Sequence, residues 1–310
     1  MTTVHTASTT VDTPTGPLNA LVHVPDLPGP LPGVVMVDGS GDGTADDWGG
    51  WPERVAALGA VVLTHDKPGC GGSPGDWTTQ TLEDRAHEAL SAAAVLRRRA
   101  EVAGPVGLLG VSQGGWVSLS AAKLAPDQVG FIVSLSGPGV SPARQDRVRI
   151  ARDLRAEGRA EAETAEALAW LDERARLLTD GRPVAEVLEL QNSLSDRPWY
   201  ATTTRYFDTE AGLGFLARII DFDAEAILPH VRCPVLALFG AADPLVPVAE
   251  GVAAFATGLP ENPANGLAVF PDADHGLFIA PPTPGTDRTA QLAPGFLTLL
   301  RGFLAARKSG

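Results

Sequence analysis

A serine between two glycines is the first feature of this sequence that could do chemistry. Gly110, Ser112 and Gly114 form a Gly-x-Ser-x-Gly pattern that follows an apolar run and precedes a helical one. A serine at the tip of a sharp strand-to-helix turn has a strained backbone, so the residues two before and two after it must be small. The first N–H groups of the following helix, beginning with Gln113, are then placed to stabilise an oxyanion. The pattern predicts that Ser112 is a nucleophile.

A nucleophilic serine needs a base, and the base needs an acid that orients it. In a strand-to-helix setting these partners follow the serine in the order acid, then histidine, each after a later strand. Of the six histidines, only His275 lies beyond the apolar run Val235 to Phe239. Asp243 follows that run directly, whereas Asp272 and Asp274 compete because they stand close to His275 in the chain. We expect Asp243 to be the acid, since side chains of neighbours on one short loop tend to point apart.

Short apolar runs alternate with longer helical stretches along most of the chain. Most of the runs lack polar alternation, which is typical of parallel strands buried on both faces. The order predicts a doubly wound, mostly parallel α/β sheet whose ligands bind at the carboxyl ends of the strands. The expected strands are Leu18 to Val24, Gly33 to Val37, Ala60 to Thr64, Val106 to Val111, Val129 to Leu135, Val235 to Phe239 and Leu267 to Phe270. The expected helices are Asp47 to Leu58, Leu82 to Arg99, Gln113 to Leu124, Val248 to Thr257 and Ala293 to Ala306.

One long segment breaks this alternation. From Ser141 to about Leu228 the sequence is helical throughout, and it opens with Ser141 and Pro142, a pair suited to the N-cap and first position of a helix. We therefore expect a core domain over 1–140 and 229–310, with a helical cap inserted at 141–228. Aromatic residues of the insertion are candidates for an apolar wall over a pocket. They are Trp170, Trp199, Tyr200, Tyr206, Phe207 and Phe215.

The stretches "GVSQGG", "CPVLALFGAADPLVP" and "DADHGLF" resemble the nucleophile elbow, acid loop and histidine loop of the α/β-hydrolase superfamily. The stretch "VVLTHDKPGCGGSPG" is similar to the Asp-Lys-Arg-Gly-x-Gly-x-Ser loop of its bacterial esterases and serine aminopeptidase-like hydrolases. The resemblance implies the α/β-hydrolase fold, acyl transfer through an acyl-enzyme, and no cofactor. Asp66 and Lys67 could shape the site or tie the loop to the domain. In such relatives this loop mostly supports the elbow, so we expect the structural role.

The same resemblance implies a second oxyanion donor on the loop after the run Gly33 to Val37. Gly39 and the N–H of Ser40 fit that role beside Gln113. Asp38 departs from the family pattern, because many relatives have His-Gly-x-Gly where this chain has Asp-Gly-Ser-Gly. An acid there keeps the backbone donor but changes the field near the developing negative charge. Capping of the loop by Asp38 is the alternative.

Charge and composition exclude several other classes. The formal net charge of −13 argues against a nucleic-acid partner, which would need clustered Lys and Arg. The N-terminal residues lack the pattern of a signal peptide and no apolar run is long enough to span a bilayer, so we expect a cytoplasmic protein without membrane contact. Two cysteines, Cys70 and Cys233, are too few for a disulfide framework or a Cys-based zinc site.

No metal or nucleotide site is expected. The stretch "DGSGDGTADDWG" partly resembles a calcium loop through Asp38, Asp42 and Gly43, but Gly49 stands where the bidentate Glu should be. The glycine-rich loops fit neither the P-loop of nucleoside triphosphatases nor the dinucleotide fingerprint.

These residues together predict a serine hydrolase. Ser112, His275 and Asp243 would cleave a carboxylic ester of a small-molecule acyl substrate, mid-sized and apolar, without a cofactor. Two alternatives remain open at this point. One is a thioesterase or acyl cyclase of a biosynthetic pathway, and the other is a hydrolase-fold protein that binds a ligand without turnover. A monomer and a homodimer are equally compatible with the sequence.

Overall fold

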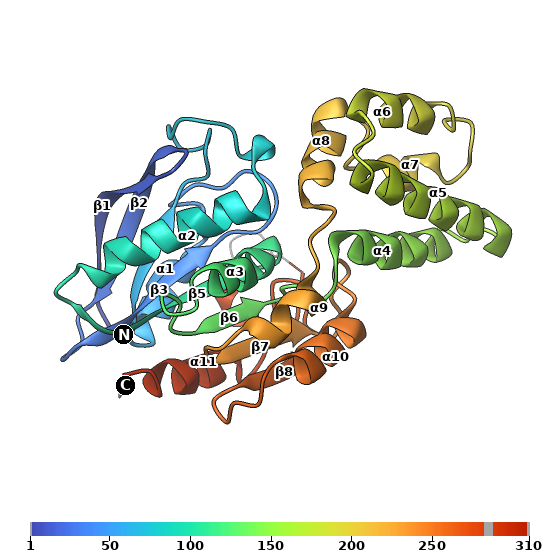
Figure 1. Ribbon diagram of the computed structural model, residues 1–310. Helices are drawn as coiled ribbons and strands as arrows, with labels where there is room; N and C mark the ends of the chain where they lie inside the picture. Colours follow the sequence, from blue (N-terminus) through green and yellow to red (C-terminus); the bar gives the residue numbers. More distant parts are fainter. Residues whose placement is uncertain (1, 282–287, 309–310) are drawn as a thin grey trace.

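An eight-stranded sheet is the centre of the computed structural model, which describes residues 2–281 and 288–308 (Figure 1). The strand order is β1-β2-β4-β3-β5-β6-β7-β8. Both pairs that involve β2 are antiparallel, and every other pair is parallel, which confirms the predicted mostly parallel α/β sheet. The strands are β1 Val4–Thr13, β2 Gly16–Pro25, β3 Leu31–Val37, β4 Val61–His65, β5 Val102–Val111, β6 Ile132–Leu135, β7 Val235–Gly240 and β8 Gly266–Phe270.

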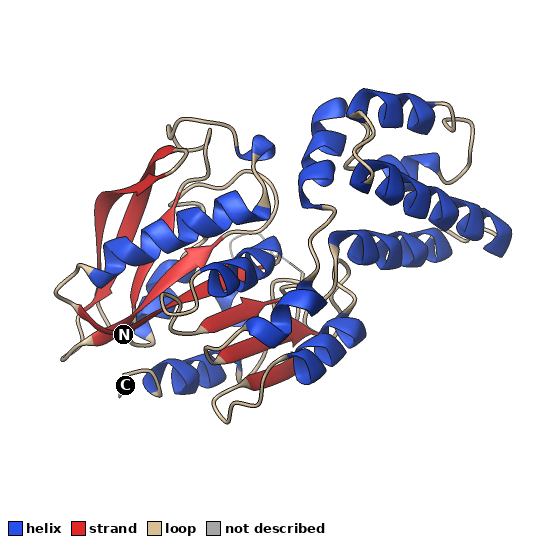
Figure 2. Cartoon of the chain, viewed as in Figure 1, coloured by secondary structure: helices blue, strands red, loops and turns tan. Residues whose placement is uncertain are grey.

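Helices cover both faces of this sheet (Figure 2). Both faces of the sheet are apolar. In β3, Val35 and Val37 belong to one buried apolar cluster, and Val34 and Met36 belong to the other. Side chains alternate across a strand, so a continuous apolar run supplies both clusters. The first cluster contains residues of α2 Leu82–Arg97, α3 Gln113–Leu124 and α10 Val248–Gly258, and the second contains residues of α1 Trp51–Ala57 and α11 Phe296–Ala305.

The bounds of several elements differ from the sequence expectation by a few residues, and two differences have a clear physical cause. β1 was not predicted, because its sequence VHTASTTVDT is polar and only Val11 is fully buried, and the strand is held mainly by its pairing with β2. Helix α1 begins at Trp51 rather than at Asp47. Gly50, the residue before it, has the left-handed φ of 81°, which a right-handed helix cannot contain.

Helices alone make up the segment between β6 and β7 in the described structure. Ser141 caps the first of them by accepting a hydrogen bond from the N–H of Arg144 at 3.3 Å, and Pro142 follows, which confirms the expected start. Figure 1 shows α4 to α8 beside the sheet rather than on one of its faces. The helices are α4 Pro142–Ala156, α5 Glu161–Thr179, α6 Val184–Asn192, α7 Tyr200–Thr204, α8 Glu210–Ile219 and α9 Ala224–Ile227.

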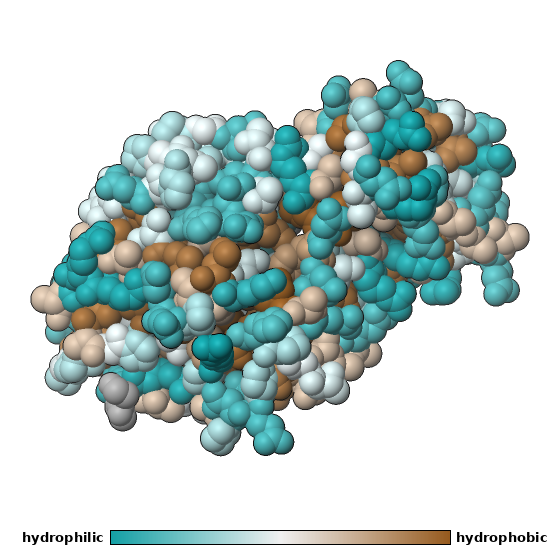
Figure 3. All heavy atoms as spheres, viewed as in Figure 1, coloured by the Kyte–Doolittle hydropathy of each residue, from teal (hydrophilic) through white to brown (hydrophobic). Residues whose placement is uncertain are grey.

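The helical segment has a small apolar core of its own, in which Ile150, Leu154, Leu171 and Trp199 are buried. Hydrophobic atoms are visible in the hollow where this segment meets the rest of the molecule (Figure 3). No helix in the described residues has the length and the apolar character needed to cross a membrane. The division into a core domain and a cap remains a prediction.

Parallel strands bring distant segments to one edge of the sheet. Asp38 follows β3, Lys67 lies two residues after β4, Ser112 follows β5, Asp243 lies after β7 and His275 lies after β8. All of these strands run in the same direction, so their carboxyl ends lie at one edge.

Candidate active site

Ser112 occupies the turn between β5 and α3 with a φ of 53° and a ψ of −121°. This conformation is costly for a residue with a side chain, and its N–H is fixed by a 2.9 Å hydrogen bond to the carbonyl oxygen of Leu135. A Cβ at Gly110 would overlap the carbonyl of Gly114, and one at Gly114 would overlap the carbonyl of Val37. The flanking positions must therefore be glycine.

His275 and Asp243 meet from two different loops. The Nδ1 of His275 lies 2.7 Å from the Oδ2 of Asp243, whose side chain has no solvent exposure. The Oδ1 of Asp243 accepts hydrogen bonds from the N–H groups of Leu245 and Val246, at 2.7 and 3.1 Å. These donors fix the carboxylate. A carboxylate accepts from Nδ1–H, so the imidazole tautomer leaves Nε2 free to accept a proton.

The competing acids lie elsewhere on the histidine loop. Asp274 accepts hydrogen bonds from the N–H groups of Gly276 and Phe278, at 2.8 and 2.9 Å. Asp272 is exposed and has a positive φ of 58°. Asp274 therefore shapes the loop that presents His275, whereas Asp243 contacts the ring.

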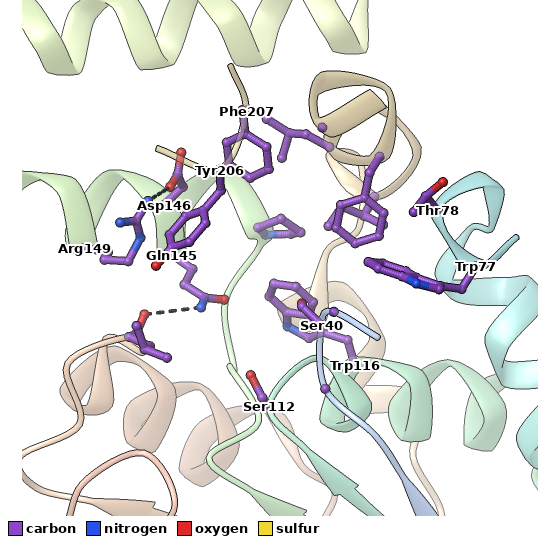
Figure 4. A pocket seen from close by; sticks show the side chains of 18 of the residues that line it. Ser40, Trp77, Thr78, Ser112, Trp116, Gln145, Asp146, Arg149, Tyr206 and Phe207 are labelled. Atoms are coloured by element: carbon purple, nitrogen blue, oxygen red, sulfur yellow. Dashed lines mark hydrogen bonds and ion pairs between the residues drawn. The ribbon is translucent and has the colours of Figure 1, made fainter. Parts of the chain in front are cut away.

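Ser112 and His275 both line a cavity of about 610 Å³. Figure 4 shows Ser112 at one end of it, with Ser40 and Trp116 nearby and Tyr206 and Phe207 at the far side. Of the six aromatic residues expected to form a wall, Tyr206, Phe207 and Phe215 line the cavity, whereas Trp170, Trp199 and Tyr200 do not. The apolar lining residues are Trp77, Val111, Trp116, Pro142, Tyr206, Phe207, Ala211, Phe215, Leu216, Ile219 and Leu245.

Polar groups of α4 stand on the wall of the cavity opposite Trp77 (Figure 4). Asp146 accepts from Arg149 at 2.6 Å and from Arg174 at 2.7 Å, so the carboxylate is shared by two guanidinium groups. Gln145 donates to the carbonyl oxygen of Leu245 at 3.2 Å and so joins α4 to the loop of Asp243. This polar group had no sequence signal, because Arg and Asp on an amphipathic helix are usually solvent-exposed.

The loop after β3 lies against Ser112. An ideal Cβ on Gly39 would be 3.3 Å from the Cβ of Ser112, which is closer than most side chains approach. Asp38 accepts a hydrogen bond from the N–H of Gly39 through Oδ1 at 2.6 Å, and its Oδ2 lies 3.4 Å from the Nζ of Lys67. The negative charge that sets Asp38 apart from the family pattern is therefore balanced by a buried ammonium. Asp38 caps its own loop, and Ser40 lines the cavity.

Lys67 acts on this loop as well, and it does so through hydrogen bonds to the backbone. Its Nζ donates to the carbonyl oxygen of Gly39 at 2.6 Å and to that of Gly41. Asp66 does have the expected structural role, because it accepts from the N–H of Ala45 and from the hydroxyl of Ser73, both at 2.8 Å.

The environment of Lys67 weakens its hold on a proton. Burial, with the nearby Arg85 guanidinium, lowers the pKa of Lys67 to about 8, and Asp38 opposes the shift. A group with this pKa changes its charge just above neutral pH.

Arg85 of α2 lies beside the site, and the sequence does not indicate this position. It is buried, and it donates to the carbonyl oxygen of Asp38 and to the side chain of Gln113. An arginine three residues into a predicted helix is ordinarily solvent-exposed, so only the fold shows that this one faces the site. Groups of three or more His, Cys, Asp or Glu that could hold a metal are absent from the described residues.

Comparisons with known proteins identify the family of this chain. The family model described as alpha/beta hydrolase family matches residues 31–284. A search of curated protein sequences found no match. Among solved structures, the chain is similar to Est1E from Butyrivibrio proteoclasticus with ferulic acid bound, at 16% identity, covering 97% of this chain and 100% of that chain with a TM-score of 0.60.

Two further solved structures are similar. An esterase from Pyrobaculum calidifontis has 17% identity and a TM-score of 0.55, covering 98% of this chain and 85% of its own. The 2,6-dihydroxy-pseudo-oxynicotine hydrolase has 18% identity and a TM-score of 0.56, covering 98% of this chain and 70% of its own. At these identities the likeness shows the fold.

The glycine after the serine turn gives a stability prediction. Gly114→Ala should lower the free energy of unfolding by about 1–3 kcal/mol or more, because its Cβ has no space beside the carbonyl of Val37. Gly302→Ala is the matched control, since it lies inside α11 with nothing within 4 Å of the added Cβ. It should raise stability by about 0.4–1 kcal/mol. Urea denaturation measures both, and equal effects would contradict the packing argument.

The low pKa of Lys67 predicts an alkaline limit to activity. Above pH about 8 the lysine loses its proton, and Asp38 loses the charge that balances it beside Gly39. We expect kcat/KM for a neutral ester to fall as the pH rises through this value. In Lys67→Met the activity should be lower throughout, and this alkaline decline should be absent. An unchanged decline in the variant would assign it to another group.

Proposed function

We propose that this chain, which belongs to the alpha/beta hydrolase family, is a serine hydrolase that cleaves a carboxylic ester. Ser112 is the nucleophile, His275 the general base and Asp243 the acid that orients it. One observation carries the proposal. Ser112, Asp243 and His275 lie on three separate loops, yet Asp243 contacts His275 at 2.7 Å, and His275 and the strained Ser112 line one cavity.

The reaction follows from these positions. The Nε2 of His275 takes the proton of the Ser112 hydroxyl while Oγ attacks the acyl carbonyl carbon. The N–H groups of Gln113 and Ser40 stabilise the negative charge on the carbonyl oxygen. The bond to the leaving alcohol then breaks, and His275 returns its proton to that alcohol. Water, activated by the same imidazole, attacks the acyl-enzyme and releases the carboxylic acid and Ser112.

The cavity favours a mid-sized, apolar acyl compound. Its walls combine Trp77, which lies between β4 and α2, and Trp116 of α3 with aromatic residues of the helical segment. These are Tyr206, Phe207 and Phe215. We assign residues 141–228 the role of a cap on this basis. The structure of Est1E holds ferulic acid, an aromatic acid, which makes esters of aromatic acids a sensible first group to screen.

A fluorophosphonate probe tests the proposal without knowledge of the substrate. The purified protein should gain a single adduct, and peptide mass analysis should locate it on Ser112. Ser112→Ala should form none, and His275→Ala should react at least about 1000-fold more slowly, since the base no longer activates the hydroxyl.

His87→Ala is the matched control for the base. This histidine is exposed on α2, so its loss should leave the labelling rate unchanged. A folded wild-type protein that forms no adduct with a small fluorophosphonate would overturn the proposed serine chemistry. An adduct on another serine would do the same.

A further inference from the structure

Arg85 is a buried cation that has no direct anionic partner among the described residues. Its guanidinium donates to three oxygens, the carbonyls of Asp38 at 2.9 Å and Gly39 at 3.3 Å and the Oε1 of Gln113 at 2.6 Å. All three acceptors are uncharged. The carboxylates that attract Arg85, Asp38 and Glu88, act without a direct bond, and burial lowers the pKa of the guanidinium. Buried charges are usually paired, because an unpaired one costs free energy.

Two of the three acceptors of Arg85, the Gly39 carbonyl and the Gln113 side chain, belong to residues beside the proposed oxyanion site. Gln113 follows the nucleophile, and the Gly39 carbonyl is part of the same peptide unit as the Ser40 N–H. All described peptide bonds are trans, so the carbonyl and the N–H of this unit point in opposite directions. The Gly39 carbonyl faces Arg85 and Lys67, which places the Ser40 N–H on the other side, where Ser40 lines the cavity.

Buried charges of both signs surround these groups. Lys67 lies 3.4 Å from the carboxylate of Asp38, and the buried carboxylate of Glu88 attracts Arg85 without a direct bond. The oxygens to which Arg85 donates are uncharged, so a negative charge that forms on the substrate carbonyl oxygen would interact with the guanidinium through these groups.

We propose that Arg85 and Lys67 are positioning residues that form a cationic support behind the oxyanion hole. They hold the Gly39–Ser40 peptide and Gln113 in the orientation that the transition state needs, and the positive charge of Arg85 stabilises the oxyanion through these groups. The inference rests on the proposed function. Preorganised dipoles and charges aimed at the site of charge development lower the barrier without reorganisation during the reaction.

Three variants separate orientation from charge. Arg85→Met removes the donors and the charge at similar length. Arg85→Lys keeps the charge and loses the fork of donors. Gln113→Glu is isosteric and leaves the backbone N–H in place, but its carboxylate accepts the Arg85 hydrogen bond and neutralises the guanidinium. This third variant keeps the test decisive if Arg85→Met does not fold.

Arg97→Met is the matched control. Arg97 lies at the other end of the same helix, and its guanidinium also donates a hydrogen bond to a backbone carbonyl, that of Gln128. Each protein is assayed for kcat and KM with p-nitrophenyl acetate, for the dissociation constant of phenylboronic acid, and for thermal stability. Phenylboronic acid forms a tetrahedral adduct on a reactive serine and so reports on the oxyanion hole directly.

We expect Arg85→Met to lower kcat by roughly 100-fold and to raise the dissociation constant of phenylboronic acid by a similar factor, with KM unchanged. Gln113→Glu should likewise lower kcat and weaken the binding of phenylboronic acid. Arg85→Lys should restore part of the loss, and Arg97→Met should match the wild type. A role in folding alone would lower thermal stability and leave kcat and boronate affinity unchanged.

The inference is overturned if Arg85→Met or Gln113→Glu retains wild-type kcat, or if kcat falls while boronate affinity does not change. These results would leave the proposed function intact, because the wild type would still react at Ser112. A wild-type protein that neither turns over the ester nor binds the boronate at Ser112 overturns the proposed function, and this inference with it.

Discussion

The strained backbone at Ser112 is the constraint on which the site depends. A non-glycine residue with a φ of 53° and a ψ of −121° costs about 1–3 kcal/mol, and it persists only where the surroundings hold it. The bond from its N–H to Leu135 and the close packing of Gly110 and Gly114 provide that support. The turn therefore projects the hydroxyl into the cavity, and it places the start of α3 directly beside the hydroxyl.

Electrostatics add a second level to this arrangement. Asp38 is bound to its own loop and balanced by Lys67. Arg85 joins the loop after β3 to Gln113 across the site. An acid in this loop is thus compatible with an oxyanion hole, since the charges that surround the acid are arranged to compensate for it.

The sequence predicts the features of this protein that are local in the chain. The glycines around Ser112 are required by the backbone turn itself, and the continuous apolar runs of β3 to β7 follow from burial on both faces. The order of Asp243 and His275 after later strands is also visible in the sequence. These patterns involve residues close in sequence, or strands whose order is typical of parallel sheets.

Features that depend on distant contacts were not predictable. β1 has few apolar residues, and its place in the sheet depends on pairing with β2. The roles of Lys67 and Arg85 appear only when β3, β4 and α2 are packed together. The same holds for Asp146. One of its guanidinium partners, Arg149, lies one turn away on α4, and the other, Arg174, lies on α5.

If Ser112 is the nucleophile, it carries the acyl group during turnover. Rapid mixing of the protein with a p-nitrophenyl ester, followed by intact and peptide mass analysis after an acid quench, measures this step. We expect a burst of about one p-nitrophenol per protein molecule and an acyl group on Ser112, both absent in Ser112→Ala. Release of p-nitrophenol at the same rate by wild type and Ser112→Ala, with no acylated peptide, would contradict this role of Ser112.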